Sequence, residues 1–425
     1  MMNEIKRFSF LSLGCKVNFY ENSALRSVFL SRGYLEDDIN PDIIVINTCS
    51  VTATADQKSR QHIRSLRKKH PHSIICVMGC YAQKNHKFIL ESCGADIITG
   101  TSNRNKIPEY IDKFLIDHEK VDYTKDNPRS FSYEEISLTS FSENVRAYLK
   151  IQDGCNQFCT YCIIPHVRGV SRSRNFDAVI NEAKEIVNNG FKEIVLTGIH
   201  VGGYGRDLKD KSFSDLLEAL SNIEGLKRIT ISSIDSHEID DKLIELLKTK
   251  DNIAHHIHIC LQSGSNSVLK RMNRHYDTDS FLDVCRRVKE AIPDVAITTD
   301  VIVGFPGESE EEFKESFDFI KKCGFAMLHV FPFSPREGTL AARMKGQISP
   351  EIKKKRAKIL LDLSDELWDK FLNENNGRYF DVLVESYDED KELLFGHTSN
   401  YIGVSFKGKR EDINKIINVK YDKNN

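Results

Sequence analysis

The stretch AYLKIQDGCNQFCTYC, residues 147–162, joins a predicted strand to a loop that holds three cysteines. Apolar and polar residues alternate in its first half, which is typical of a strand, and Cys155, Cys159 and Cys162 follow in a C-x3-C-x2-C spacing. No nearby cysteine or histidine completes a four-ligand zinc site at the usual spacing. Three thiolates suit a 4Fe–4S cluster that leaves one iron open. The stretch therefore predicts a metal cluster directly after a strand.

Downstream of this stretch, the alternation of strand and helix repeats. Strand candidates begin at residues 147, 193, 228, 255, 295 and 327, and amphipathic helical patterns lie between them, at 177–189, 214–223, 240–248, 279–292 and 310–322. Six consecutive β–α units predict a β/α barrel, either complete and TIM-like or partial, because eight strands are not found. Barrel enzymes place their chemistry on the loops after the strands, which is where the three cysteines lie.

The regions on either side of the barrel predict two further domains. Apolar runs at 8–14, 42–48, 73–79 and 95–100 alternate with helical patterns, so residues 1–121 predict a doubly wound parallel α/β domain. Residues 122–143 contain five serines and no periodicity, and we interpret them as a linker. A charged helix from Ser349 to about Leu372 ends the barrel domain, residues 144–372. Residues 373–425 alternate apolar and polar positions, which predicts a small antiparallel β-barrel of four or five strands.

Composition limits the class of protein. The 425 residues carry 60 Lys and Arg against 62 Asp and Glu, a net charge of −2, so a polyanionic partner would need local basic patches. The eleven cysteines are an odd number, and the sequence shows neither a secretory leader nor a long apolar run. These features exclude a secreted disulfide scaffold and a membrane span, and they predict a cytoplasmic protein with reduced thiols.

Three further cysteines each follow a predicted strand of the first domain: Cys15, Cys49 and Cys80. Because ligands of an open α/β sheet collect beyond the carboxyl ends of its strands, we expect these thiols to share a metal site, although each could also be a buried core cysteine. We interpret the remaining cysteines as packing residues, and they are Cys76, Cys93, Cys260, Cys285 and Cys323.

With these positions in place, the chain resembles the methylthiotransferases of the radical S-adenosylmethionine (SAM) superfamily. The motifs that carry the resemblance are LGCKVN (13–18), NTCSVT (47–52), MGCYAQ (78–83), DGCNQFCTYCIIPHVRG (153–169), LTGIHVGGYGRDL (196–208), LQSGS (261–265), TTDVIVGFPGE (298–308), FPFSPREGT (331–339) and GHTSNYI (396–402). The resemblance implies an N-terminal methylthiotransferase domain, a radical SAM barrel and a C-terminal TRAM domain that grips RNA.

The resemblance also implies the cofactors and the reaction. Cys155, Cys159 and Cys162 would hold a 4Fe–4S cluster that binds SAM and cleaves it to a 5′-deoxyadenosyl radical. Cys15, Cys49 and Cys80 would hold an auxiliary 4Fe–4S cluster. Two SAM molecules would be used, one as radical source and one as methyl donor. The product would be an adenine with a methylthio group at C2. The C–H bond at C2 is not acidic, so acid–base catalysis cannot break it and a radical is needed.

Within the family, LGCKVN and the stretch from NTCSVT to ADQKSRQ are most similar to the branch that acts on N6-threonylcarbamoyladenosine in tRNA, immediately 3′ of the anticodon. The isopentenyladenosine branch typically has glutamine and methionine around its first cysteine, and the ribosomal-protein branch has Cys-Pro, whereas this chain has Cys15-Lys16-Val17. Relatives usually carry proline where Cys260 stands. The resemblance implies a tRNA partner, an electron donor such as flavodoxin or ferredoxin, an unidentified sulfur donor and a monomeric protein.

Positions at strand ends suggest a SAM pocket, for which the candidates are Gly198, His200, Ser232, Ser233, Gln262 and Asp300. Candidate RNA contacts are a basic helix face, the residues after the cysteine loop and a C-terminal patch. They are Arg60, Arg64, Arg67, Lys68, Arg168, Arg172, Arg174, Lys407, Lys409 and Arg410. A solvated helix face would explain the first group equally well, and a stability cap would explain the last domain. Strand alternation places His256 and His258 on one face and His255 on the other, which favours barrel packing over a shared metal.

Other functions remain open at this point. The same chemistry could act on N6-isopentenyladenosine in tRNA or on an aspartate of a ribosomal protein. A cobalamin-dependent methylase would need a D-x-H-x-x-G loop, and the nearest match, residues 235–240, lacks the glycine and lies outside the first domain. A non-catalytic iron-sensing RNA-binding protein would bind iron and tRNA without cleaving SAM.

Overall fold

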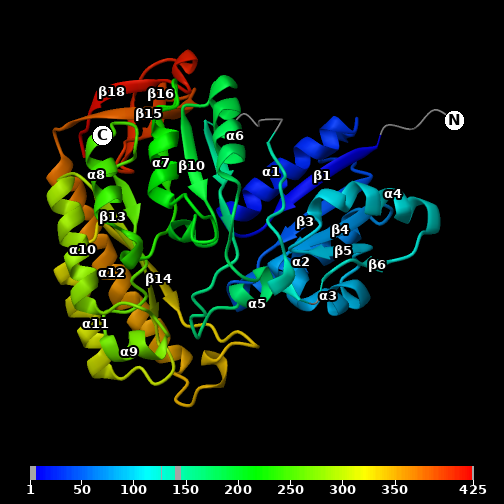
Figure 1. Ribbon diagram of the computed structural model, residues 1–425, viewed down its shortest axis with the longest axis horizontal. Helices are drawn as coiled ribbons and strands as arrows, with labels where there is room; N and C mark the ends of the chain where they lie inside the picture. Colours follow the sequence, from blue (N-terminus) through cyan, green and yellow to red (C-terminus); the bar gives the residue numbers. More distant parts are fainter. Residues whose placement is uncertain (1–5, 126, 139–144, 424–425) are drawn as a thin grey trace.

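The computed structural model describes residues 6–125, 127–138 and 145–423 and shows the expected order of an α/β domain, a barrel and a small β domain (Figure 1). The strands of the N-terminal domain form one parallel sheet in the order β2-β1-β3-β4-β5-β6. Their bounds are β1 (Arg7–Ser12), β2 (Leu35–Glu36), β3 (Ile43–Thr48), β4 (Ile74–Gly79), β5 (Ile97–Gly100) and β6 (Val121–Asp122). Strands β2 and β6 were not predicted, because strands of two residues carry no alternation of apolar and polar residues.

Helices cover both faces of this sheet, which confirms the doubly wound prediction. They are α1 (Lys16–Ser31), α2 (Ala53–Lys69), α3 (Cys80–Ser92) and α4 (Ile107–Asp117). Phe29 of α1 and Ile111 of α4 pack with Val45 on one face, and Ile63 of α2 and Ile89 of α3 pack on the other. Cys15, Cys49 and Cys80 follow the neighbouring parallel strands β1, β3 and β4, so all three lie at the carboxyl ends of the strands.

The central domain is a partial barrel of six parallel strands. The strands are β7 (Arg146–Lys150), β10 (Glu193–Thr197), β11 (Arg228–Ile231), β12 (His256–His258), β13 (Ala296–Val303) and β14 (Met327–Pro332). They form two three-stranded sheets, β7-β10-β11 and β12-β13-β14, which single parallel bridges at Ile229–Ile253 and Ile234–Ile259 connect. The structure thus decides for the partial barrel over the complete one.

The barrel strands are covered by an outer layer of helices. These helices are α6 (Phe176–Asn188), α7 (Phe213–Ser221), α8 (Asp241–Thr249), α10 (Thr278–Ala291), α11 (Glu310–Cys323) and α12 (Pro350–Asn375). The loops after strands contain four shorter elements: the helices α5 (Ile164–Arg168) and α9 (Asn266–Arg271), and the paired strands β8 (Gln152–Asp153) and β9 (Arg172–Ser173). Cys285 of α10 and Cys323 of α11 belong to the barrel core, and Cys76 and Cys93 belong to the N-terminal cores, as expected of packing residues.

The C-terminal domain is a four-stranded antiparallel sheet in the order β17-β16-β15-β18. Its strands are β15 (Tyr379–Asp388), β16 (Leu393–His397), β17 (Gly403–Lys407) and β18 (Ile416–Lys420). Arg228 at the start of β11 donates to the backbone oxygens of His397 and Asp381, both at 2.9 Å. The sheet therefore covers the amino ends of the barrel strands, at the end away from α5 (Figure 1).

The segment interpreted as a linker is packed where the structure describes it. Phe131 and Leu138 are buried, the Tyr133 hydroxyl donates to the Lys150 oxygen at 2.9 Å, and Glu134 pairs with Arg104 at 2.7 Å. Residues 126 and 139–143 of this segment lie outside the described residues. The domain boundaries at 121, 143 and 372 stay a prediction. No helix in the described part of the chain is long and apolar enough to cross a membrane.

Candidate active site

The loop of residues 154–162, here called the cluster loop, leaves the end of β7 and is held at several points. Gly154 has a φ of +72°, and a side chain there would collide with the backbone oxygen of Val170, so only glycine fits. The Cys155 amide donates to the Gly169 oxygen at 3.0 Å, and the Thr160 amide donates to the Met272 oxygen at 3.0 Å. The Cys162 amide donates to the Cys159 oxygen at 3.0 Å, so backbone hydrogen bonds fix the loop that carries the three cysteines.

The thiols of this loop lie in surroundings that suit metal ligation. Burial raises the pKa of both Cys155 and Cys162 to about 12. The Gln157 amide donates to the Cys155 sulfur at 3.4 Å, and Arg274 donates to the Cys159 sulfur at 3.2 Å. Burial opposes free thiolates, while nearby N–H donors stabilise thiolates that a metal has already neutralised in part. The donor set fits a 4Fe–4S cluster with three cysteine ligands.

The second group of cysteines comes together at the edge of the N-terminal sheet. Cys15 follows β1 and precedes α1, Cys49 follows β3, and Cys80 begins α3 after β4. A Cβ atom placed on Gly14 would lie 2.9 Å from the Cys49 sulfur. Burial raises the pKa of the Cys80 thiol to about 12, and the thiols of Cys49 and Cys15 are close enough to raise it further. Three thiols gathered at the carboxyl ends of neighbouring strands fit a second cluster with three protein ligands.

A buried ion network joins the two cysteine groups. Arg168, at the end of α5 and fully buried, donates to the Cys80 sulfur at 3.2 Å and to Glu21 of α1 at 2.7 Å. Asp153, next to the cluster loop, accepts from Arg168 at 3.1 Å and from Lys150 at 2.6 Å. Cys80 also packs against Ile163 and Val167, which directly follow the cluster loop. The position of one cysteine group is therefore fixed relative to the other.

Glu21 is the central acid of this network. Burial alone would raise the pKa of Glu21, but Arg104, Arg168 and Lys150 hold that pKa well below its usual range. Lys150, Arg168 and Arg172 outweigh burial at Asp153 and lower the pKa of its carboxyl, so both carboxyl groups are ionised. Glu21, Arg104 and Arg274 were not among the predicted site residues, because no local spacing in the sequence connects them to cysteines far along the chain.

The structure does not support RNA contact by the arginines after the cluster loop. Arg168, Arg172 and Arg174 are buried, and their guanidinium groups pair with Asp153, Glu182 and other internal acids. Arginines in salt bridges below the surface cannot reach phosphate without breaking those bridges. Arg168 contacts Cys80, Arg172 pairs with Asp153 beside the cluster loop, and Arg174 joins Tyr20 of α1 to Glu182 of α6.

The other RNA candidates differ in exposure and in whether their side chains already pair with groups inside the protein. Arg67 pairs with Asp96 and donates to the Gly94 oxygen at 2.8 Å, which commits it to the fold. Arg60 and Arg64 of α2 lie over rings of α3, Arg60 over Tyr81 and Arg64 over Phe88. Lys68 is exposed. Lys407, Lys409 and Arg410 are exposed on the C-terminal domain, although Arg410 pairs with Glu389 at 2.6 Å.

The SAM candidates lie on two sides of the barrel. On the β10 side, the His200 amide donates to Gln152 at 2.8 Å, and Gly198 packs closely against Gln152. Burial opposes a charge on His200, but Asp235 and Glu238 raise its pKa to about 9. On the β13 side, the Gln262 amide donates to the Asp300 oxygen at 2.8 Å. Ser233 is exposed, and the Ser232 hydroxyl has no partner among the described residues.

A small cavity opens between the cluster loop and the β10 side. It is lined by Asn156, Gln157, Ser171, His200, Arg206 and Asp207. All six lining residues have polar side chains, and Asn156 and Gln157 directly follow Cys155 in the chain. A polar cofactor could contact the cluster loop from this cavity.

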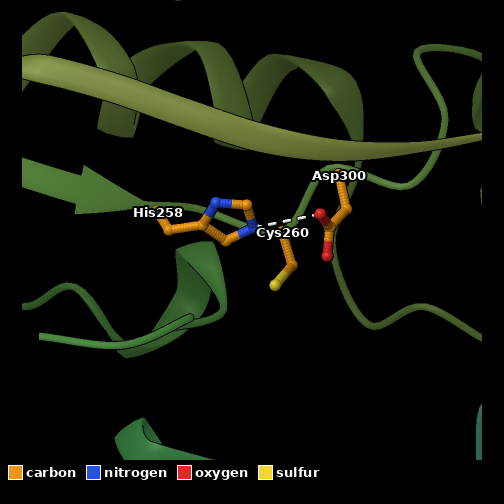
Figure 2. A group of neighbouring side chains, drawn as sticks. All are labelled: His258, Cys260 and Asp300. Atoms are coloured by element: carbon orange, nitrogen blue, oxygen red, sulfur yellow. Dashed lines mark ion pairs between the residues drawn. The ribbon is translucent and has the colours of Figure 1, made fainter. Parts of the chain in front are cut away.

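Cys260 differs from the packing role expected of it. Figure 2 shows the His258 ring directed toward the Asp300 carboxylate, with Cys260 between them. The His258 Nε2 atom lies 3.4 Å from an Asp300 oxygen, and one ligand atom from each residue lies within 4.8 Å of the others. His256 and His258 both contact the Thr298 hydroxyl, whereas His255 pairs with Asp294 at 2.9 Å. The predicted division of the three histidines between two faces is confirmed.

Comparison with known proteins gives two family matches. The radical SAM superfamily matches residues 149–320, and the uncharacterized protein family UPF0004 matches residues 7–100. The threonylcarbamoyladenosine tRNA methylthiotransferase MtaB of Bacillus subtilis (strain 168) is 46% identical over 418 residues, 97% of this chain and 93% of that protein. The tRNA-2-methylthio-N(6)-dimethylallyladenosine synthase of Clostridium botulinum (strain Loch Maree / Type A3) is 35% identical, over 100% of this chain and 96% of that protein.

Solved structures share the fold. The radical SAM methyltransferase TsrM from Kitasatospora setae, with cobalamin and a 4Fe–4S cluster bound, superposes with a TM-score of 0.61 at 12% identity, over 80% of this chain and 77% of that one. The cobalamin-dependent SAM radical enzyme OxsB superposes with a TM-score of 0.53 at 15% identity, over 86% of this chain and 56% of that one. At these identities the likeness shows the fold alone.

Proposed function

Because the chain belongs to the tRNA methylthiotransferase family of radical SAM enzymes, we propose that it adds a methylthio group to C2 of N6-threonylcarbamoyladenosine in tRNA, immediately 3′ of the anticodon. The observation that carries the proposal is the 46% identity over 97% of the chain to a threonylcarbamoyladenosine tRNA methylthiotransferase. The two cysteine groups, held together by Arg168, support the same chemistry. Relatives named for dimethylallyladenosine are 35% identical, which makes that substrate the second candidate.

Two clusters suit this reaction. When bound, SAM and the cluster held by Cys155, Cys159 and Cys162 supply a radical that can remove the unreactive C2 hydrogen, and a cluster held by Cys15, Cys49 and Cys80 supplies an iron for the incoming sulfur. We propose that two SAM molecules are used per product, one as radical source and one as methyl donor. We expect the protein to be a monomer, with flavodoxin or ferredoxin as electron donor and a sulfur donor yet to be identified.

The protein's own residues position these groups and protect them. Arg274 and Arg168 donate to the sulfurs of Cys159 and Cys80, and such hydrogen bonds tune the potential of a cluster. The ion network around Glu21 and Asp153 fixes the distance between the two cysteine groups. Since a radical must meet the target carbon and the sulfur at nearly the same place, a rigid connection between the groups serves the reaction directly.

Iron content tests the number of clusters. After anaerobic reconstitution, the wild-type protein is expected to bind about eight irons per chain, which two cubane clusters require. Iron is measured with a colorimetric chelator and by the visible absorption of the clusters. A content of about four irons would contradict the assignment of Cys15, Cys49 and Cys80 to a second cluster.

Nucleoside analysis tests the substrate. The reconstituted protein, with SAM, a reductant and sulfide, is incubated with tRNA that carries N6-threonylcarbamoyladenosine or with tRNA that carries N6-isopentenyladenosine. Mass spectrometry of the digested nucleosides is expected to show the 2-methylthio product with the first tRNA only. Product with the second tRNA alone would assign the chain to the isopentenyladenosine branch.

A further inference from the structure

Three side chains with metal-ligating atoms come together at β12 and β13 of the barrel. His258 is the last residue of β12, Cys260 lies two residues beyond it, and Asp300 belongs to the neighbouring strand β13. Residues two apart in an extended chain share one face, and Ile259 and Leu261, which alternate with Cys260, pack in the barrel core. The histidine and the cysteine therefore lie on the opposite face, where Figure 2 shows them beside Asp300.

Backbone hydrogen bonds fix the positions of these three residues. The Ile234 amide donates to the His258 oxygen at 2.9 Å, and the Cys260 amide donates to the Ile234 oxygen at 3.1 Å. On the other side, the Gln262 amide donates to the Asp300 oxygen at 2.8 Å. A ligand that binds between the three side chains therefore meets a backbone that is already in place, which lowers the cost of binding.

The ligand atoms of the three side chains lie at the spacing of a metal site. The His258 Nε2 atom lies 3.4 Å from an Asp300 oxygen, and one ligand atom from each of the three residues lies within 4.8 Å of the others. Two ligand atoms bound to one tetrahedral zinc ion at about 2.0–2.2 Å are about 3.4 Å apart. The nitrogen and the oxygen thus have the spacing of two ligands of one ion, with Cys260 between their side chains (Figure 2).

Hydrogen bonds within the protein do not occupy these ligand atoms. His258 is 8% exposed, yet its Nε2 atom makes no hydrogen bond with any described residue, Asp300 included. The Nδ1 atom of the same ring contacts the Thr298 hydroxyl at 3.0 Å, which keeps Nε2 directed toward the carboxylate. Among the described residues, neither the Asp300 carboxylate nor the Cys260 sulfur takes part in a hydrogen bond. Because a buried polar atom without a partner costs free energy, these atoms indicate a bound ligand.

A second group in the barrel shows what an occupied ion network looks like. It also brings three possible ligand atoms within 4.8 Å of one another, and its members are His200, Asp235 and Glu238. Both of its acids already pair with arginines, one with Arg274 and the other with Arg206 at 2.9 Å. In the part of the chain that the structure describes, no lysine or arginine forms an ion pair with Asp300. The charge of Asp300 is therefore left for a bound cation, whereas the acids of the second group are neutralised by the protein itself.

We propose that His258, Cys260 and Asp300 bind a zinc ion, with an imidazole nitrogen, a thiolate sulfur and a carboxylate oxygen as ligands. Zinc takes all three ligand types in proteins, whereas magnesium and calcium take oxygen ligands. Binding displaces the proton of the Cys260 thiol to solvent and transfers no electron. Three protein ligands leave the fourth position to water, as in zinc sites that keep an open position. The zinc is additional to the two clusters, since none of its ligands belongs to either cysteine group.

Zinc binding by the reconstituted protein tests the inference. With both clusters in place, the protein is equilibrated with a small excess of Zn²⁺, desalted and analysed by mass spectrometry of the metals. We expect about one zinc per wild-type chain, and zinc bound at least about 100-fold more weakly by Cys260→Ser in competition with a chromophoric chelator, because a ligand is lost. His258→Gln removes the imidazole and keeps the thiol, and the same loss is expected. Cys323→Ala, which removes a packing thiol of the barrel core, is the matched control and is expected to bind zinc as the wild type does.

X-ray absorption at the zinc edge identifies the ligands. The wild-type protein is expected to show one sulfur at about 2.3 Å, with nitrogen and oxygen ligands at about 2.0–2.2 Å. Zinc with three sulfur ligands, bound equally by Cys260→Ser, would place the metal in an emptied cysteine group and overturn the inference. A wild-type protein without zinc would overturn it as well. Equal iron content and circular dichroism in all variants show that a loss of zinc is not a loss of fold, and neither measurement depends on tRNA modification.

Discussion

Cys159→Ala is expected to end the reductive cleavage of SAM. Cys159 is the middle ligand of the cluster loop, and its sulfur is the one that accepts from Arg274 at 3.2 Å. Two remaining thiols cannot hold a cubane cluster with a single open iron, so SAM would lose its electron source. We expect 5′-deoxyadenosine formation, measured by chromatography after anaerobic reduction with dithionite, to fall to the level of protein without iron.

Cys49→Ala provides the contrast that separates the two cysteine groups. Cys49 lies at the edge of the N-terminal sheet, next to Gly14 and across the domain contact from the cluster loop. Its loss is expected to leave 5′-deoxyadenosine formation within about twofold of the wild type and to abolish the methylthio product, with about four irons remaining per chain. Cys93→Ala, which removes a packing thiol of the same domain, is the control and is expected to keep both activities.

The outcome that would contradict these assignments is equally specific. If Cys49→Ala lost SAM cleavage as completely as Cys159→Ala, the two groups would not act separately. If Cys159→Ala kept SAM cleavage, the cluster loop would not hold the SAM cluster.

Glu21→Gln is expected to destabilise the contact between the N-terminal domain and the barrel by about 3–5 kcal/mol, as for breaking a buried ion pair. Glu21 is buried and pairs with Arg104, with Lys150 at 2.8 Å and with Arg168 at 2.7 Å. Glutamine has nearly the same shape, so the change removes the charge and leaves three buried cations with one fewer acid. The measurement is the urea midpoint of the reconstituted protein, followed by circular dichroism and by cluster absorption.

The pH dependence of this effect has a definite sign. The folded-state pKa of Glu21 lies well below 4.5, its ordinary value, so the carboxylate contributes stability above pH 4.5 and loses that contribution as pH falls through the folded pKa. The difference between the wild type and Glu21→Gln is therefore expected to be full at neutral pH and to shrink in acid. The matched control is Glu109→Gln, which removes an exposed acid of α4 that pairs with Arg32. Equal midpoints for the two variants would show that the network does not stabilise the contact.

Much of the fold follows from local sequence. The six barrel strands and the main strands of the first domain were predictable, since buried parallel strands form apolar runs of about six residues and the helices between them are amphipathic. The partial closure of the barrel was not, because closure depends on how strands twist and tilt together. The single bridges at Ile229 and Ile234, not any motif, connect the two halves.

The arginines after the cluster loop show where sequence reasoning fails. In the sequence, Arg168, Arg172 and Arg174 form a basic group beside a reactive loop, which favours phosphate binding. In the structure, Glu21 of the N-terminal domain pairs with Arg168, Asp153 pairs with Arg172, and Glu182 of α6 pairs with Arg174, all inside the protein. Charge alone does not tell whether a basic residue faces water or a buried acid distant in sequence.

The sequence by itself determined the cysteine positions and the domain order, because metal ligands close together in the chain have a recognisable spacing and strand ends are marked by apolar runs. Only the tertiary structure decided which groups face one another. It brought Cys80 against the residues after the cluster loop and placed Arg168 beside Cys80, Glu21 and Asp153. The physical reason is that burial and charge pairing depend on contacts between segments far apart in the chain, which no local pattern encodes.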